Sequence, residues 1–187
     1  MSYCFLACLF TCGVVIHNLE EAVWLPAWSA RTGRGHKAVS AASFRFAVTI
    51  LSLAVLVGTG LAVIGGKHSF GAYFLAGYAL AMVFNVFVPH VIVSVALRTY
   101  APGTATALLL NLPLGSWFIY QSLAGGYIKS SVYLISGPFT VLALGVSIPL
   151  LFYLGNWFTK QSCGDTLASN SITPQPLNKD NQMETRK

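Results

Sequence analysis

Five long apolar segments, separated by short polar or glycine-containing turns, constrain this chain more than any other feature. A helix needs about 20 residues to cross the hydrocarbon core of a bilayer. The chain is 55% hydrophobic and only 9% charged, whereas soluble domains carry roughly 25% charged residues. Because these few charges cannot cover a soluble surface, the sequence predicts an all-α, polytopic membrane helix bundle of about five transmembrane helices.

The predicted transmembrane helices are the ranges 3–25, 44–64, 70–97, 104–123 and 132–158. Pro26 is expected to end the first helix, and Pro89 to interrupt the third. Residues 1–158 are therefore interpreted as one bundle. Residues 159–187 are rich in Ser, Asn, Gln and charge, lack apolar periodicity, and are predicted to form a disordered cytoplasmic tail.

The basic residues predict the orientation of the bundle. With the amino terminus outside, most of them fall on the cytoplasmic side, as the positive-inside rule requires. The residues predicted inside are Arg31, Arg34, Lys37, Arg45, Arg98 and Lys160, and those predicted outside are Lys67 and Lys129. Because the net charge of +6 is spread over loops and tail, we expect the lipid bilayer as a partner and no nucleic acid.

Three polar residues interrupt the first apolar segment. His17, Glu20 and Glu21 are spaced i, i+3 and i+4, so they share one face of a helix. A carboxylate inside a bilayer costs several kcal/mol unless it is paired, protonated or bound to a cation. Two adjacent carboxylates one turn from an imidazole therefore call for an explanation, either functional or structural.

Further polar residues are predicted at a similar depth. Counting the rise per residue from the cytoplasmic ends of the helices brings Asn85 and His90 of the third segment, and Asn111 of the fourth, into the same leaflet. The turn of residues 98–103 would close one side, and Tyr100 could reach inward. The sequence thus predicts a polar pocket that opens toward the inner leaflet.

The string His17-Asn18-Leu19-Glu20-Glu21, followed by Leu25-Pro26-Ala27-Trp28, resembles the signature of the HXXEE-domain integral membrane proteins. Later elements are similar in the same order: Asn85 with His90, Tyr100-Ala101-Pro102-Gly103, Thr106 and Asn111. The family is mostly bacterial, which implies a bacterial inner membrane, and it has no established activity. The resemblance implies a shared polar site but names no reaction.

One hypothesis is an intramembrane enzyme acting on a lipid or isoprenoid-like substrate. A carboxylate in a low dielectric can act as an acid near neutral pH, and an imidazole can relay its proton. The predicted catalytic residues are Glu20, Glu21, His17 and His90. The predicted substrate-binding residues are Asn85, Asn111 and Tyr100.

Three alternatives stay open. A divalent metal such as zinc or iron could be held by His17, Glu20, Glu21 and His90, since helix bundles build such carboxylate–histidine sites. The polar groups could instead carry protons or cations across the membrane. They could also be purely structural, with a glutamate locked to Arg45 or Arg98 in a buried ion pair.

Overall fold

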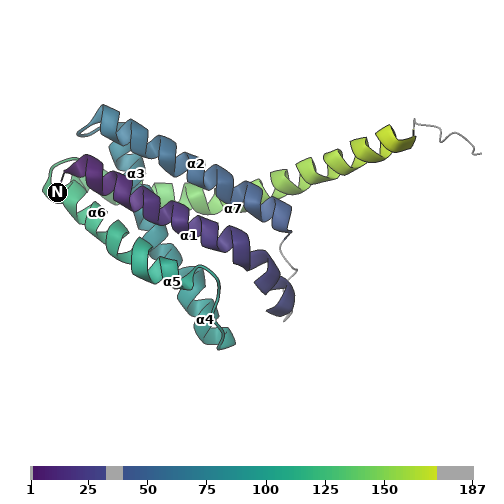
Figure 1. The fold of residues 1–187 in the computed structure, drawn as a ribbon. Coiled ribbons are helices and arrows are strands. Elements are labelled where there is room, and N and C mark those ends of the chain that lie inside the picture. Colours follow the sequence, from purple (N-terminus) through teal and green to yellow (C-terminus); the bar gives the residue numbers. More distant parts are fainter. Residues whose placement is uncertain (1, 33–39, 172–187) are drawn as a thin grey trace, which may run out of the picture.

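The computed structural model describes residues 2–32 and 40–171, with side chains to residue 159. Every secondary-structure element in these ranges is a helix. The elements are α1 (Tyr3–Thr32), α2 (Ala41–Gly65), α3 (Phe70–Asn85), η1 (Val86–Val91), α4 (Ile92–Leu97), α5 (Thr104–Thr106), η2 (Ala107–Asn111), α6 (Leu112–Ala124) and α7 (Ser130–Ser171). The long helices pack lengthwise beside one another (Figure 1), which confirms the prediction of an all-α bundle.

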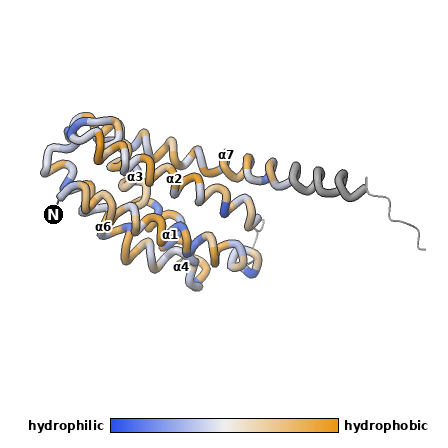
Figure 2. Tube along the Cα trace, turned by 45° about the horizontal axis from the view of Figure 1, so that its top comes forward, coloured by the Kyte–Doolittle hydropathy of each residue, from blue (hydrophilic) through white to orange (hydrophobic). Residues whose placement is uncertain are grey.

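Four helical stretches are long and apolar enough to cross a membrane: Tyr3–Thr32, Ala41–Gly65, Phe70–Leu97 and Ser130–Thr159. The predicted span 104–123 is divided among the consecutive elements α5, η2 and α6. Large apolar side chains such as Ile64, Phe70 and Ile135 are exposed on the outside of the bundle, and apolar residues run along the helices (Figure 2). An apolar exterior is what a lipid environment requires, so the chain is a membrane protein.

The core lies in the half of the bundle that contains the amino terminus. There α1 packs against α2 and α6, and α3 packs against α2, α6 and α7. Leu6, Phe10 and Val14 of α1 are buried with Leu75 and Phe118. Because lipid is as apolar as these side chains, van der Waals packing, and not the hydrophobic effect, holds such a core together.

The turn between α2 and α3 meets the turn between α6 and α7 at this end. The His68 N–H donates to the carbonyl of Tyr127 at 2.8 Å. The Tyr3 and Tyr127 rings stack face to face, and Lys67 Nζ lies 5.5 Å from the centroid of the Tyr127 ring. These contacts tie the start of α1 to both turns, so the turn 98–103 lies at the opposite end of the bundle.

The prediction that Pro26 ends the first helix is wrong, because α1 continues to Thr32 with Pro26 inside it. Proline has no N–H and leaves the carbonyl four residues earlier without its helical donor. Arg45 of α2 supplies the missing donor, since its Nε donates to the Ala22 carbonyl at 3.2 Å. A neighbouring helix thus satisfies the freed group, as happens in membrane bundles.

The predicted interruption at Pro89 is confirmed. Between α3 and α4 the backbone forms the π-helical segment η1, in which Val88 has non-helical angles (φ −124°, ψ 107°) and the Val88–Pro89 peptide bond is cis. A second π-helical segment, η2, precedes Pro113, and the two segments contact each other. Such segments are frequent at functional sites, and His90 lies in η1.

The last helix is longer than predicted. α7 runs from Ser130 to Ser171, past the expected end at residue 158, and includes Pro138 and Pro149. The rest of the predicted tail, residues 172–187, lies outside the described residues. Residues 33–39, which include Arg34 and Lys37, also lie outside them.

Candidate functional site

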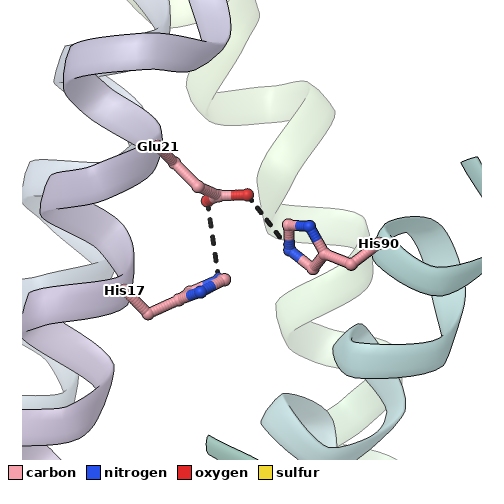
Figure 3. Close-up of side chains that lie close together, drawn as sticks. All are labelled: His17, Glu21 and His90. Atoms are coloured by element: carbon pink, nitrogen blue, oxygen red, sulfur yellow. Dashed lines mark ion pairs between the residues drawn. The ribbon is translucent and has the colours of Figure 1, made fainter. Parts of the chain in front are cut away.

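Two histidines and a glutamate converge near the turn 98–103. His17 and Glu21 lie one turn apart on α1, and His90 reaches them from η1 (Figure 3). Nε2 of His17 is 3.8 Å from Oε2 of Glu21, and Nε2 of His90 is 3.2 Å from Oε1. The imidazoles are almost fully buried, with 0% and 2% exposure, and Glu21 is 15% exposed. We call these three residues the His–Glu–His cluster.

The contacts inside the cluster are not hydrogen bonds. The His17–Glu21 separation is too long for one. Nε2 of His90 is buried and has no hydrogen-bond partner, although the carboxylate oxygen of Glu21 lies nearby. One ligand atom from each of the three side chains thus lies within 4.8 Å of the others, although no hydrogen bond joins the carboxylate to either imidazole.

The hydroxyl of Thr106 determines the tautomer of His17. It donates its single proton to Oε2 of Glu20 at 2.6 Å, and Nδ1 of His17 lies 3.0 Å from the Thr106 hydroxyl oxygen. A hydroxyl has one proton to give, and the amide nitrogen of Asn85 faces Nε2, so both contacts favour the tautomer in which Nδ1 of His17 is the donor. A neutral His17 then presents a lone pair on Nε2, where the amide of Asn85 approaches at 3.3 Å.

Glu20 has different surroundings from Glu21. Its Oε1 accepts hydrogen bonds from the Tyr100 hydroxyl at 2.6 Å and from the Gly103 N–H at 3.0 Å, and its Oε2 accepts the Thr106 hydroxyl. Partial burial and the bond to Glu20 raise the pKa of the Tyr100 phenol, so Tyr100 remains a donor. We call Glu20, Tyr100, Gly103 and Thr106 the Glu20 clamp.

Gly103 joins the clamp to the cluster. Its φ is +90°, a conformation that glycine adopts readily. A Cβ at this position would lie 2.6 Å from Cε1 of His90, 2.9 Å from Cγ of Glu21 and 3.1 Å from Cε1 of His17. The backbone therefore presses directly against all three side chains, and only glycine leaves enough room.

The two asparagines that were predicted to share the site lie in different surroundings. Asn85 contacts His17, as expected. Asn111 is fully buried, but both of its amide atoms lack a hydrogen-bond partner among the described residues. The structure thus does not bring Asn111 into hydrogen-bond contact with the predicted site residues. Its nearest neighbours across the helix interface include Gly13 of α1.

A pocket of about 240 Å³ lies beside the cluster, between α1, α2, α3 and α7. Its wall is mostly apolar, and the polar side chains in it include Asn18, Glu21 and Asn85. On the α7 side the wall contains Gly145, where an added Cβ would meet nothing within 4 Å. One carboxylate of the site therefore borders an apolar space.

The described residues show no buried glutamate–arginine pair. Arg45 is exposed and donates to the Ala22 carbonyl, while Arg98 is exposed at the end of α4. The ion pairs among the described side chains are those of Glu21 with His17 and His90. The structural alternative of a glutamate–arginine lock is therefore wrong.

Gly103 and Thr106 were not predicted as site residues. Both stand in or next to the Tyr100-Ala101-Pro102-Gly103 string that carries the family resemblance. A glycine directly after a proline, followed three residues later by a hydroxyl side chain, could have indicated a turn folded back on α1. The spacing alone does not show that both groups bind Glu20.

Comparison with known proteins supports the resemblance. Residues 8–118 match a family described as proteins of unknown function with an HXXEE motif. The chain is also 33% identical over 147 residues to the uncharacterised protein YrkK of Bacillus subtilis (strain 168), covering 79% of this chain and 93% of that protein. No solved structure matches. The matched range contains the whole cluster and the whole clamp.

Proposed function

The chain belongs to the HXXEE family, whose function is unknown, and we propose from its own geometry that it is an intramembrane enzyme acting on a hydrophobic substrate. The observation that carries the proposal is the apolar pocket with Glu21 and Asn85 in its wall. Ligand sites are mostly apolar cavities with a few polar groups that fix orientation. This pocket has that character.

The size of the pocket favours a slender substrate. Its volume of about 240 Å³ is somewhat below the ~300–1,000 Å³ of pockets that enclose a drug-sized ligand. It suits one segment of a lipid or isoprenoid chain whose remainder lies in the bilayer. A larger groove of about 400 Å³ runs between α2 and α3, but no titratable side chain lines it, so it offers no reactive group.

The chemistry would come from the cluster. A carboxylate and two imidazoles are groups that exchange protons with a substrate. Glu21 borders the pocket and would touch the substrate, while His17 and His90 lie behind it. Asn85 lines the same wall and contacts His17, so it would orient a polar group of the substrate. Glu20 and Tyr100 would position the cluster through the clamp.

The packing argues against a transport path for protons or cations. A conduit needs polar groups toward both faces of the membrane. On the amino-terminal side of the cluster, α1 instead buries Leu6, Phe10 and Val14 against Phe118. Two buried hydroxyls in this half, those of Thr11 and Thr59, bond to each other, so mainly apolar side chains lie between the cluster and that end of the bundle.

We also propose that the chain lies in a bacterial cell membrane with the cluster in the cytoplasmic leaflet. Arg31, Arg45 and Arg98 belong to the end of the bundle that holds the cluster, and Lys67 belongs to the other end. The positive-inside rule then places the amino terminus outside. The bacterial relative supports the choice of organism class.

The experiment is photolabelling of the purified chain with a diazirine derivative of palmitic acid and one of farnesol. We expect labelled peptides from the pocket wall of α3 and α7 with at least one probe. Gly145→Trp should abolish the labelling, because the ring fills the pocket. Gly60→Trp is the matched control, since a Cβ at Gly60 also meets nothing within 4 Å and the residue faces outward.

Turnover is followed in parallel by mass spectrometry of total bacterial lipids incubated with each variant. A species consumed by the wild type and by Gly60→Trp, but not by Glu21→Gln or Gly145→Trp, is the expected result. Equal labelling of all variants, together with unchanged lipids, would refute the proposal.

A further inference from the structure

We propose that the His–Glu–His cluster binds a divalent transition metal, and that Zn²⁺ is the ion it suits best. The inference concerns the site of the proposed function, but metal binding does not require that the proposed substrate is right. Two histidines and one glutamate are a ligand set of catalytic zinc sites. Helix bundles hold metals with side chains from facing helices, as α1 and η1 do here.

The separations of the ligand atoms agree with a shared ion. Atoms bound at ~2.0–2.2 Å to a tetrahedral zinc are ~3.3–3.6 Å from one another. The observed distances are 3.2 Å from Nε2 of His90 to Oε1 of Glu21 and 3.8 Å from Nε2 of His17 to Oε2, so the two imidazoles approach different oxygens of one carboxylate. One ligand atom from each of the three residues lies within 4.8 Å of the others. Small side-chain adjustments would complete the coordination.

The electrostatics of the cluster favour a cation. Thr106 leaves His17 with a lone pair on Nε2, which contacts the side-chain amide nitrogen of Asn85 at 3.3 Å and lies 3.8 Å from a carboxylate oxygen of Glu21. Nε2 of His90 is buried and has no hydrogen-bond partner. Buried polar atoms are rarely left unpartnered. A cation between the three side chains would give Nε2 of His90 and the carboxylate of Glu21 a partner, and it would replace the Asn85 amide at Nε2 of His17.

The Glu20 clamp has the form of an outer shell around a metal site. A metal-binding histidine usually donates its other N–H to an oxygen that fixes its ring and tautomer. Here Nδ1 of His17 donates to Thr106, which in turn donates to Glu20. Glu20 was predicted as a ligand, but three donors from the clamp already engage its oxygens. The inferred ligand set is therefore His17, Glu21 and His90.

Three protein ligands leave one position of a tetrahedral ion open, and catalytic zinc sites keep such a position for water or substrate. Glu21 is both a ligand and part of the pocket wall. The metal would thus lie at the polar end of the apolar pocket. It would act as the Lewis acid of the proposed enzyme, and Glu21 would then be a ligand instead of a proton donor.

The test is elemental analysis of the full chain, purified in detergent with a histidine-free tag and without chelator. The protein is loaded with Zn²⁺, dialysed, and compared with His17→Gln, Glu21→Gln and His90→Gln. His68→Asn is the control, because His68 lies in the turn at the opposite end of the bundle. We expect about one zinc per chain in the wild type and the control, and none in the three ligand variants.

Replacing zinc by Co²⁺ gives a second readout, since a tetrahedral Co²⁺ site has intense visible absorption that should vanish in the same variants. Gel filtration of each variant identifies any that fails to fold. Wild-type protein without stoichiometric metal after loading would overturn the inference, as would zinc retained by both His17→Gln and His90→Gln. Photolabelling of the same preparations separates the proposals: a labelled pocket without metal removes the metal site alone.

Discussion

Glu20 and Glu21 are adjacent on α1, yet the Glu20 clamp and the His–Glu–His cluster are opposites in their bonding. The carboxylate of Glu20 accepts three short hydrogen bonds from the segment 100–106. The carboxylate of Glu21 faces two imidazoles without a hydrogen bond to either. Neighbouring residues on a helix point about 100° apart, so each glutamate meets a different part of the chain.

The comparison shows that a glutamate can be structural or reactive, depending on how many hydrogen-bond donors surround its carboxylate. A buried anion that is fully hydrogen-bonded is stabilised in place. A buried anion that is only partly satisfied is costly, and it persists where another ligand completes it. The clamp is complete within the chain, whereas the cluster would be completed by the cation that we propose. Substitutions at several positions can test this contrast between the clamp and the cluster.

The largest effect is expected from Gly103→Ala, which breaks clamp and cluster together. The new Cβ would clash with His90 and Glu21, and the residue would keep a positive φ. Strain and overpacking together predict a loss of roughly 2–5 kcal/mol in the free energy of unfolding. Thermal unfolding in detergent measures it. Gly66→Ala is the control, since Gly66 has a φ of +66° and open space around its Cβ position; equal losses in both variants would show that the clash is unimportant.

A comparison of Glu20→Gln with Glu21→Gln should show which glutamate stabilises the fold and which one binds the metal. Glu20→Gln weakens charge-assisted hydrogen bonds and should cost about 1.5–3 kcal/mol in the free energy of unfolding. Glu21→Gln should leave the metal-free protein as stable as the wild type, or more so, because it removes an incompletely satisfied charge. Unfolding with and without Zn²⁺ measures both. If the two variants lose stability equally, the contrast between the glutamates is wrong.

Thr106→Val tests whether the Glu20 clamp affects metal binding by the His–Glu–His cluster. It preserves the shape of the side chain but removes the hydroxyl that joins Glu20 to His17. Loss of such an outer-shell contact is expected to lower zinc affinity ~10–100-fold. Competition with a fluorescent chelator measures the affinity. Thr106→Ser should restore it, and an unchanged affinity in Thr106→Val would remove the clamp from the metal site.

Tyr100→Phe tests the outermost bond of the clamp. It removes one donor to Glu20 and leaves two. Because Tyr100 is 55% exposed, water can replace the lost hydroxyl, and we expect a destabilisation of only ~0.5–1 kcal/mol. Zinc affinity should change little. A larger loss of affinity than in Thr106→Val would mean that Tyr100 acts on the cluster directly.

Asn111→Leu should have the smallest effect and the opposite sign. Asn111 is buried without a hydrogen-bond partner among the described residues, in neither the clamp nor the cluster. Replacing an unsatisfied amide by an apolar side chain of similar size is nearly neutral or stabilising, within about 1 kcal/mol. Chemical unfolding measures it. A marked destabilisation would indicate that the amide has a partner and a role.

The sequence predicts some of these features and not others, for physical reasons. The helices and the approach of His90 to His17 and Glu21 follow from hydropathy and depth. Depth does not fix the direction in which a side chain points around its helix, so Asn111 was grouped with residues that it does not contact. The prediction that the first helix ends at Pro26 took no account of Arg45, which donates to the freed carbonyl from another helix. The role of Thr106 depends on how the turn before it folds, which no periodic pattern encodes.

The residues of the clamp lie far apart in the sequence, and this has a consequence for biosynthesis. Thr106 follows Glu20 by 86 residues, so at ~5–20 residues per second the ribosome needs about 4–17 s to supply it. During that interval α1, the span with the lowest mean hydropathy of the four, carries two carboxylates whose partners in the segment 90–106 have not yet been made. α1 should therefore remain near the insertion machinery, and enter the lipid stably only when the segment 90–106 has emerged to receive it.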